Sequence, residues 1–509
     1  MKRPTEVLRG AIAAVRERLV VVAGQSERNL LLGGVLLASA LCAVTGFVLT
    51  QYYSVDVLSS LLYEPYDCLA DWDTKVGSHC FSDYALPVSL GMRPNPWELY
   101  PLYVPPDFKP VLNNYTAAGM LPQMVFGMLG SWLAAPRLGL LGYQLVLTIS
   151  VLSPAVWAAR GARGLERVVV FLACGFAAIP AWMTIDRGNS VGFVVPIALI
   201  FLVALCRRRW GLVAVMVVLA TLVKPQFAVI GVVLLAARHW RLGGIAVAGG
   251  LVSNLAAYAL WPRDFPRTIP QSVHNILGYG TFRGSVSEEN VSFARVLLMV
   301  PDGIKARETG GTIPDGFLAG PRSLIGYVIL VLVVLLILAL GRRIPPVMAG
   351  IVLLATASLF LAVSFHYYLV FALPVAALVA RDPDGPPGTG IFDRLETVGG
   401  RRRVVGVCVS LAAVASIVAI ALPGPPHMVQ ILGPTGAVFR DISLAQTTVF
   451  LAPLLWLVTC GAIIVSYARR PAPSSRNEHE LAGEDPPGSA AGAPSTSEPE
   501  TDAAVATPP

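Results

Sequence analysis

The sequence predicts an all-α, multi-pass membrane protein with about 12 transmembrane helices. Of its 509 residues, 55% are hydrophobic and only 14% are charged, and the mean hydropathy is +0.66. Continuous apolar stretches of about 18–23 residues recur, each long enough to cross ~30 Å of hydrocarbon as a helix. Backbone polar groups must be satisfied within the lipid, which leaves a helix bundle or a closed barrel, and continuous rather than alternating apolar runs favour the bundle.

The distribution of charge predicts the topology. The net charge is +7, and arginines gather in short loops, which is typical of the cytoplasmic loops of membrane proteins rather than of nucleic-acid binding. We therefore expect both termini in the cytoplasm and two long extracytoplasmic loops, at about 51–135 and 262–321. The expected location is the inner (cytoplasmic) membrane, and a scarcity of lysine weakly favours a bacterium.

Residues 1–29 form a basic cytoplasmic segment, and the first span is expected at about 30–50. This apolar core is longer than that of a signal peptide and has no convincing cleavage site, so it reads as an uncleaved anchor. The last part of the following loop, 115–135, is apolar but broken by Gly and Pro. It is either a spanning helix or an interfacial or re-entrant one. The arginines that follow the next span, 137–159, favour the second interpretation.

The remaining spans alternate with arginine clusters. Residues 211–237 are too long for one span and short for two, and Lys224-Pro225 divides them, so we predict a hairpin of two short helices. The one transmembrane domain ends near residue 468, and the Pro-, Ser- and acid-rich tail 469–509 should be disordered in the cytoplasm. The other spans are expected at about 167–184, 190–206, 242–261, 322–341, 346–364, 367–380, 404–422 and 447–467.

Four polar clusters fall at the outer ends of these helices or in the loops just above them. Ionisable residues cost about 2.5–3.5 kcal/mol at the bilayer centre, so a chain that keeps several of them usually has a site there. A water-soluble acceptor and a lipid-borne reactive group can meet at this level. The clusters are Asp83-Tyr84, Asp186-Arg187-Gly188-Asn189, Lys224-Pro225-Gln226 and Phe365-His366-Tyr367-Tyr368.

Each cluster has a structural interpretation beside the functional one. Asp83 is a candidate general base or a turn residue, and four other aspartates precede it in the same loop. Asn189 can cap a helix, or can bind a phosphate together with Arg187. The rival aspartates are Asp56, Asp67, Asp71 and Asp73.

Lys224 and His366 also leave two interpretations open. A lysine beside a proline in an apolar stretch can snorkel to the surface, or can hold an anion. His366 and the two tyrosines after it can belong to an interfacial aromatic belt, or can contact a sugar or phosphate.

Two cysteines, Cys68 and Cys80, share the first extracytoplasmic loop, and we expect a disulfide between them in an oxidising compartment. The other cysteines lie in apolar helices or at a basic helix end. The sequence has no Cys/His spacing typical of a metal site and no carboxylate cluster that demands one. We therefore expect no metal and no cofactor.

The order of these elements resembles the polyprenyl-phosphate-sugar-dependent glycosyltransferases of the GT-C superfamily, specifically glycosyltransferase family 87, common in actinobacteria. The resemblance covers about residues 30–470 and rests on the order of the motifs rather than on any one of them. The matching motifs are Gly188-Asn189, Lys224-Pro225 and Arg238-His239-Trp240-Arg241, then Asn290-Val291-Ser292-Phe293, similar to the family's Asn-x-Ser element, and Ser364-Phe365-His366-Tyr367, similar to its Ser-Trp-x-His region.

The resemblance implies a GT-C-like bundle with interfacial helices and an extracytoplasmic active site. It implies inverting transfer of mannose or arabinofuranose from a polyprenyl-phosphate donor to a glycolipid or cell-envelope polysaccharide, with Asp83 as general base. The loop before Asp83 is longer than expected for the family, which keeps Asp56 as a rival. The residues implied to bind substrate are Asp186, Arg187, Asn189, Lys224, Gln226, Asn290, His366 and Tyr367.

Two other function classes compete with the transferase. A secondary transporter or a lipid or polysaccharide flippase would favour inverted repeats and charged residues at mid-membrane. The polar clusters here lie at one face, and no repeat is convincing. A non-catalytic assembly protein is the third possibility.

Overall fold

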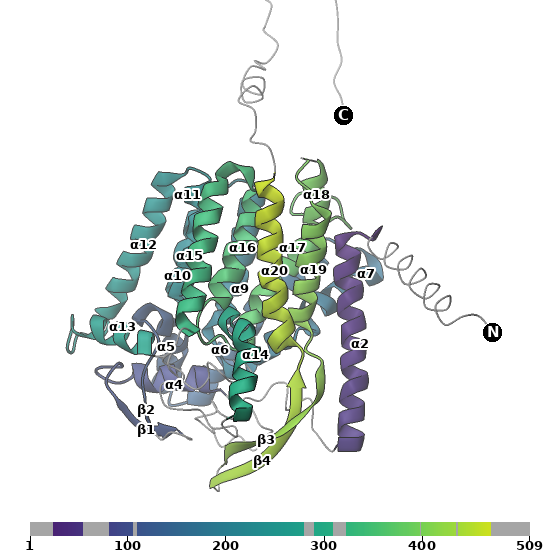
Figure 1. The fold of residues 1–509 in the computed structure, drawn as a ribbon. Coiled ribbons are helices and arrows are strands. Elements are labelled where there is room, and N and C mark those ends of the chain that lie inside the picture. The colour runs from purple at the N-terminus through teal and green to yellow at the C-terminus, as the bar shows by residue number, and fades with distance from the viewer. Residues whose placement is uncertain are drawn as a thin grey trace, which may run out of the picture. The chain divides into compact units, whose positions relative to one another are not determined.

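The computed structural model describes residues 24–53, 81–104, 109–278, 290–308, 322–397, 399–433 and 436–469. These residues form a helical bundle with two antiparallel β-hairpins (Figure 1). The helical class is confirmed by the described residues, and the β3–β4 hairpin was not expected from the sequence.

The helices, with short 3₁₀ or π segments written η, are α2 Glu27–Tyr53, α4 Ser82–Gly91, α5 Ala117–Trp132, α6 Pro136–Ala159, α7 Gly164–Phe171, η2 Leu172–Phe176, α8 Ile179–Arg187, η3 Ser190–Phe193, α9 Val194–Cys206, α10 Trp210–Val223, η4 Pro225–Gly231, α11 Val232–Ala236, α12 Trp240–Tyr258, α13 Thr268–Gly278, α14 Phe293–Glu308, α15 Arg322–Leu340, η7 Gly341–Arg343, α16 Pro346–Leu359, η8 His366–Phe371, α17 Ala372–Ala380, α18 Ile391–Thr397, α19 Arg403–Ile417 and α20 Thr448–Ala468. The strands are β1 Tyr100–Val104, β2 Lys109–Val111, β3 Ala421–Gly433 and β4 Gly436–Gln446.

Four of the described helices, α2, α6, α15 and α20, are long and apolar enough to cross a membrane. A fifth span results if α7–η2 and α8 are counted together, although they are bent by 51°. Six further apolar helical segments have only 10–17 residues. Most predicted spans thus coincide with helices, but many are short or broken, and the expected number of 12 is not confirmed.

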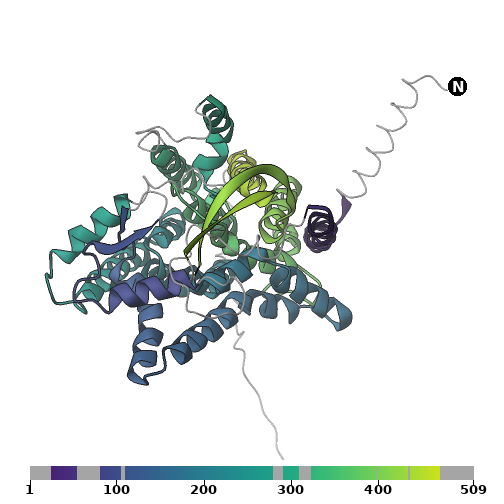
Figure 2. The same ribbon diagram turned by 90° about the horizontal axis from the view of Figure 1, so that it is seen from below.

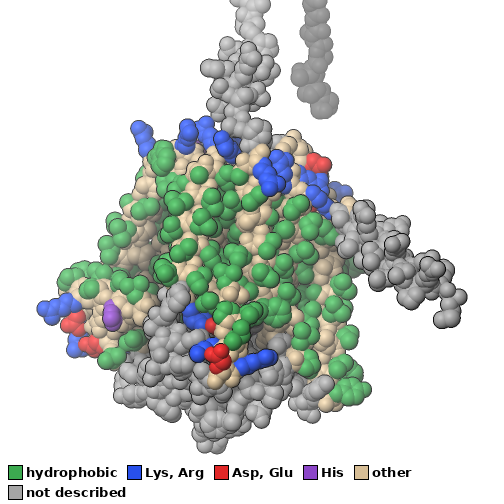
Figure 3. Space-filling view, viewed as in Figure 1, with side chains coloured by type: hydrophobic (Ala, Val, Ile, Leu, Met, Phe, Trp, Pro, Cys, Tyr) green, Lys and Arg blue, Asp and Glu red, His purple; other side chains and the backbone are tan. Residues whose placement is uncertain are grey.

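The two ends of the bundle differ in charge. The turns that carry the arginine clusters lie at one end, and α4, α13 and both hairpins lie at the other (Figure 1). Figure 3 shows blue side chains gathered along the first end, above a broad hydrophobic band. In Figure 2, viewed from the opposite end, the β3–β4 hairpin lies across the bundle. This separation agrees with the predicted topology, although which end faces the cytoplasm stays a prediction.

Ion pairs join the chain segments at the arginine-rich end. Glu27, which is 1% exposed at the start of α2, pairs with Arg401 at 2.8 Å. Arg394 of α18 pairs with Asp384 at 2.7 Å, and this hydrogen bond lowers the pKa of the Asp384 carboxyl. The first helix and the loop between α17 and α19 are therefore fixed to each other by charge.

The centre of the bundle is formed by α16 and α17. Every residue of α17 is buried, and so is every residue of α16 after Pro346. The surrounding helices, such as α6 and α15, instead expose leucines and valines, as lipid-facing helices do. The segment that joins α16 to α17 includes η8, which begins at His366. His366 is therefore held between the two buried helices, where the chain passes from one to the other.

The two long loops pack against each other at the end opposite the arginines. The indole Nε1 of Trp97 donates to the carbonyl oxygen of Tyr115 at 2.9 Å, and Asn275 of α13 donates to the carbonyl oxygen of Trp97 at 3.1 Å. The rings of Tyr258 and Trp261 pack against the same indole ring, the first tilted and the second edge-on. Helix α5, which follows Tyr115, has 16 residues and is not among the candidate spans.

Candidate functional site

Asp83, in the first turn of α4, is the centre of a charged cluster. Its Oδ2 atom accepts hydrogen bonds from Arg187 Nε and from Asn189 Nδ2, both at 2.9 Å. Its Oδ1 atom accepts none from the part of the chain that the structure describes. The Asp83 side chain is 14% exposed, whereas that of Arg187 is completely buried. Three residues from two of the predicted clusters are thus in direct contact.

The turn after α8 brings Arg187 and Asn189 to this carboxylate. Gly188 ends the helix in the left-handed conformation, with φ at +69°, which favours glycine. A Cβ atom on Gly188 would lie 2.8 Å from the Cβ of Tyr84. The turn after α8 can therefore approach α4 this closely only because residue 188 has no side chain. The hydroxyl of Tyr143 donates to the carbonyl oxygen of Gly188 at 2.8 Å and fixes the turn from below.

The capping interpretation of Asn189 is borne out by its contacts, and its binding of a phosphate stays a prediction. Its Oδ1 accepts from the backbone N–H of Val191 and caps η3, while its Nδ2 bonds Asp83. Tyr84 forms an aromatic wall beside Asp83, with its ring centroid 4.8 Å from that of Tyr143. Burial raises the pKa of Tyr84 to about 12, so this wall is uncharged at neutral pH.

Lys224 is a second cation of the site. It lies in the turn between α10 and η4, and its Nζ is 4.1 Å from the centroid of the Tyr115 ring. No carboxylate among the described residues forms an ion pair with it, although the charge of Asp83 acts on it. The hydrogen bond from Trp97 to the backbone of Tyr115 holds the Tyr115 residue in place. The packing of the two long loops therefore determines the position of the ring that the Lys224 ammonium group contacts.

His366 is a buried imidazole at the start of η8. It is 2% exposed, and neither ring nitrogen has a hydrogen-bond partner among the described residues. The next residue, Tyr367, lies with its ring centroid 5.3 Å from the Arg187 guanidinium carbon. A buried polar group normally has a partner, so this histidine is a candidate to bind a ligand.

Asn290 has a positioning role in this structure. Its Nδ2 donates to the carbonyl oxygen of Ala362 at 2.8 Å, and its Oδ1 accepts from the N–H of Ser292 and of Ser364, each at 3.0 Å. These bonds fix the segment just before His366. The geometry favours this role over a direct contact with substrate, which stays a prediction.

Several polar side chains near the cluster were missed by sequence reasoning. Gln123 donates to the carbonyl oxygen of Asp83 at 3.3 Å, but its own Oε1 has no partner among the described residues. The same is true of both amide atoms of Gln144 and of the hydroxyl of Ser190. Of the predicted residues, Gln226 has a buried Nε2 without a partner among the described residues. A single polar residue in an apolar run belongs to no motif. Only its polarity could have indicated from the sequence that it lies near the site.

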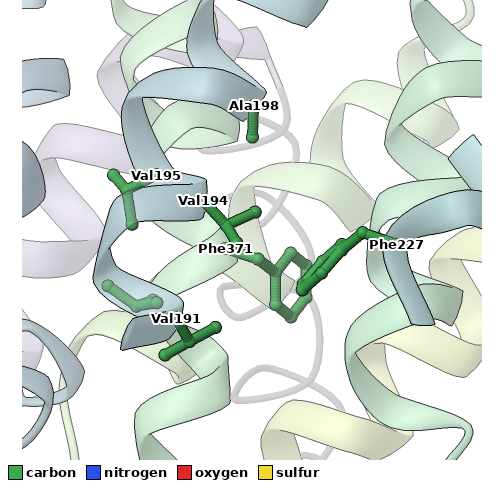
Figure 4. Close-up of a pocket in the computed structure, with 7 residues that line it drawn as sticks. Val191, Val194, Val195, Ala198, Phe227 and Phe371 are labelled. Atoms are coloured by element: carbon green, nitrogen blue, oxygen red, sulfur yellow. The ribbon is translucent and has the colours of Figure 1, made fainter. Parts of the chain in front are cut away.

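An apolar layer adjoins the site on the bundle side. Val191 and Val194 pack towards Phe227 and Phe371, in a space without room for a water molecule (Figure 4). The layer comes from η3, α9, η4 and η8, three of which begin at predicted site residues or directly after one. Polar ligands are therefore confined to the loop side of these segments.

The remaining predicted residues are less informative. Asp186 is 9% exposed in the last turn of α8, next to Arg187. Asp56, Cys68 and Cys80 lie outside the described residues, so the rival base and the disulfide stay predictions. No group of three His, Cys, Asp or Glu side chains that could hold a metal ion occurs in the described ranges.

A comparison with protein families matches residues 115–364 to the model of glycosyltransferase family 87. The matched segment includes Arg187, Asn189 and Lys224, and it leaves out Asp83 and His366. Comparisons with curated proteins and with solved structures give no significant match. The resemblance drawn from the motifs is confirmed: through residues 115–364 the chain belongs to glycosyltransferase family 87, and it is a glycosyltransferase.

Proposed function

We propose that this enzyme transfers a sugar, mannose or arabinofuranose, from a polyprenyl-phosphate donor to a glycolipid or cell-envelope polysaccharide. The transfer takes place on the extracytoplasmic face of the cytoplasmic membrane and inverts the anomeric centre. The observation that carries the proposal is the Asp83 carboxylate, which is anchored through Oδ2 by Arg187 and Asn189 while Oδ1 accepts no bond from the described residues.

Asp83 is the general base in this mechanism. The acceptor hydroxyl oxygen forms a bond to the anomeric carbon, its proton passes to Asp83 Oδ1, and the bond from the anomeric carbon to the phosphate oxygen breaks. A base must stand in one orientation for such a transfer. The two hydrogen bonds to Oδ2 provide that orientation, and the partial exposure of the side chain leaves Oδ1 accessible.

The leaving polyprenyl phosphate takes the bonding electrons and needs positive charge and hydrogen-bond donors. Lys224 offers an ammonium group without an ion pair among the described residues, and His366 offers a ring N–H that is not otherwise used. Arg187 adds a fixed guanidinium beside the base. No step of this scheme requires a metal ion or a cofactor.

The competing transporter or flippase is less well supported. The family match favours sugar transfer, and Asp83 lies in α4, one of the elements at the loop end of the bundle (Figure 1).

The proposal is tested with purified protein in lipid nanodiscs and a panel of defined polyprenyl-phosphate sugars. Wild type should consume at least one donor and release polyprenyl phosphate in step with glycosylated acceptor. Asp83→Asn keeps the size and hydrogen bonding of the side chain but removes the base, and should lower turnover by about 10²–10⁴-fold. Asp56→Asn serves as the matched control, and an inactive Asp56→Asn beside an active Asp83→Asn would move the base to the rival position.

A further inference from the structure

Gln144 is a polar residue on a lipid-facing helix that stands beside the proposed active site. It lies in the outer part of α6, between the exposed Leu141 and Leu145, but its amide atoms are buried. Its Nε2 lies 3.5 Å from the place where a Cβ on Gly188 would stand, close to the backbone of Tyr84. The amide therefore lies beside Gly188, the residue that follows Arg187 of the ion pair.

The Gln144 amide has no structural use that the described residues reveal. Neither Nε2 nor Oε1 has a hydrogen-bond partner there, and a buried amide without partners destabilises the folded state. A polar side chain in an apolar helix ordinarily bonds a backbone carbonyl of the preceding turn. Thr148, one turn further along α6, does so, because its hydroxyl donates to the carbonyl oxygen of Gln144 at 2.7 Å. Polar groups kept at such cost inside a membrane domain indicate function.

The unused atoms indicate what kind of ligand fits. Gln144 offers one donor and one acceptor, Ser190 offers a hydroxyl that can serve as either, and Gln123 offers an acceptor. A phosphate carries only acceptors at neutral pH and would leave both carbonyl oxygens unmatched. An isoprenoid chain would match none of these atoms, whereas neighbouring sugar hydroxyls donate and accept together.

We propose that Gln144 recognises the transferred sugar by bonding two neighbouring ring hydroxyls, one through Nε2 and one through Oε1. The inference rests on the proposed function, and it assigns the sugar to the α6 side of Asp83, beside Ser190. Gln144 is then a specificity-determining residue for the donor sugar. It is separate from Lys224 and His366, which face the phosphate in the proposed mechanism.

The test compares wild type with Gln144→Met, which keeps the length of the side chain and removes its polar atoms. Thr148→Val on the same helix is the matched control. Substrates are the best polyprenyl-phosphate sugar from the panel and its monodeoxy analogues. Gln144→Met should lower kcat/KM for the full sugar by roughly 10–100-fold, but by less than about 3-fold for the analogue that lacks the contacted hydroxyl. Thr148→Val should show neither effect.

Two further readouts separate recognition from a structural role. Inhibition by polyprenyl phosphate alone should be unchanged in Gln144→Met, because the amide does not contact the phosphate. The variant should also unfold at the same or a higher temperature than wild type, because a buried amide without partners has been replaced by an apolar group. A structural role would instead lower the unfolding temperature.

The possible failures are distinguishable. If wild type transfers a sugar and Gln144→Met treats the sugar and all its deoxy analogues as wild type does, the assignment of Gln144 is wrong and the proposed function stands. A loss of polyprenyl phosphate inhibition in the variant would also overturn the assignment. If wild type transfers no sugar from any polyprenyl-phosphate donor, the proposed function fails and the assignment fails with it.

Discussion

Replacement of Gly188 by alanine should damage the site from the backbone side without removing a functional group. The left-handed conformation at φ +69° costs a non-glycine residue about 1–2 kcal/mol. The new Cβ would also lie 2.8 Å from the Tyr84 Cβ, where ordinary contact begins at 3.4 Å, so Tyr84 must move by about 0.6 Å. Because Tyr84 follows Asp83, we expect turnover to fall by roughly 10–100-fold, as displacements near 1 Å do in active sites.

Gly164 provides the matched control for this experiment. It also has a left-handed backbone, with φ at +54°, but no atom lies within 4 Å of the position a Cβ would take. Gly164→Ala should therefore lower the unfolding temperature, as Gly188→Ala does, and leave turnover unchanged. Turnover is measured with the donor panel, and unfolding by thermal denaturation in detergent. If Gly188→Ala transfers sugar as fast as Gly164→Ala, the proposed contact between the two loops does not hold the base in place.

Three other predictions test separate parts of the proposal. Lys224→Met keeps the aliphatic stem of the side chain and removes its charge, so it should raise the KM for the donor at least about 10-fold with a smaller effect on kcat. Lys224→Arg keeps the charge, and its KM should stay closer to that of wild type. An unchanged KM in Lys224→Met would contradict the phosphate role. Asn290→Ala leaves the N–H groups of Ser292 and Ser364 without acceptors, at a cost of about 1–3 kcal/mol each, and a thermal denaturation scan should show lower stability. A reporter fused near residue 280 should lie outside the cytoplasm, and a cytoplasmic signal there would refute the topology.

The helices could be predicted from the sequence because apolar runs and arginine clusters mark their ends. The division of 211–237 at Lys224 is an example, since α10 ends at Val223 and η4 begins at Pro225. The β3–β4 hairpin could not be predicted in the same way. It lies between the spans predicted at about 404–422 and 447–467, in a stretch that holds several prolines, and the pairing of the two strands is a tertiary feature.

The members of the site could be named from their clusters, but their contacts could not. Asp83 and Arg187 are 104 positions apart, and only the folded bundle brings them together. The sequence predicts that Asn290 binds substrate, but its bonds to Ala362 and Ser364, 72 and 74 positions further along the chain, are visible only in the folded structure. Gln144 carries no motif at all, so its place beside Gly188 is visible only in three dimensions.

The short π-helical segment η2 allows a change of chain length ahead of the site. A π turn is an α-helix with one residue inserted, and the wider turn takes up that residue without rotating the helix beyond it. Deletion of one residue within Leu172–Phe176 would therefore restore an ordinary helical turn and leave the orientation of α8 and Arg187 largely unchanged. Deletions in this apolar segment should thus be tolerated better than deletions within α8, where each residue turns the chain by about 100° and the loss of one would rotate Arg187 away from Asp83.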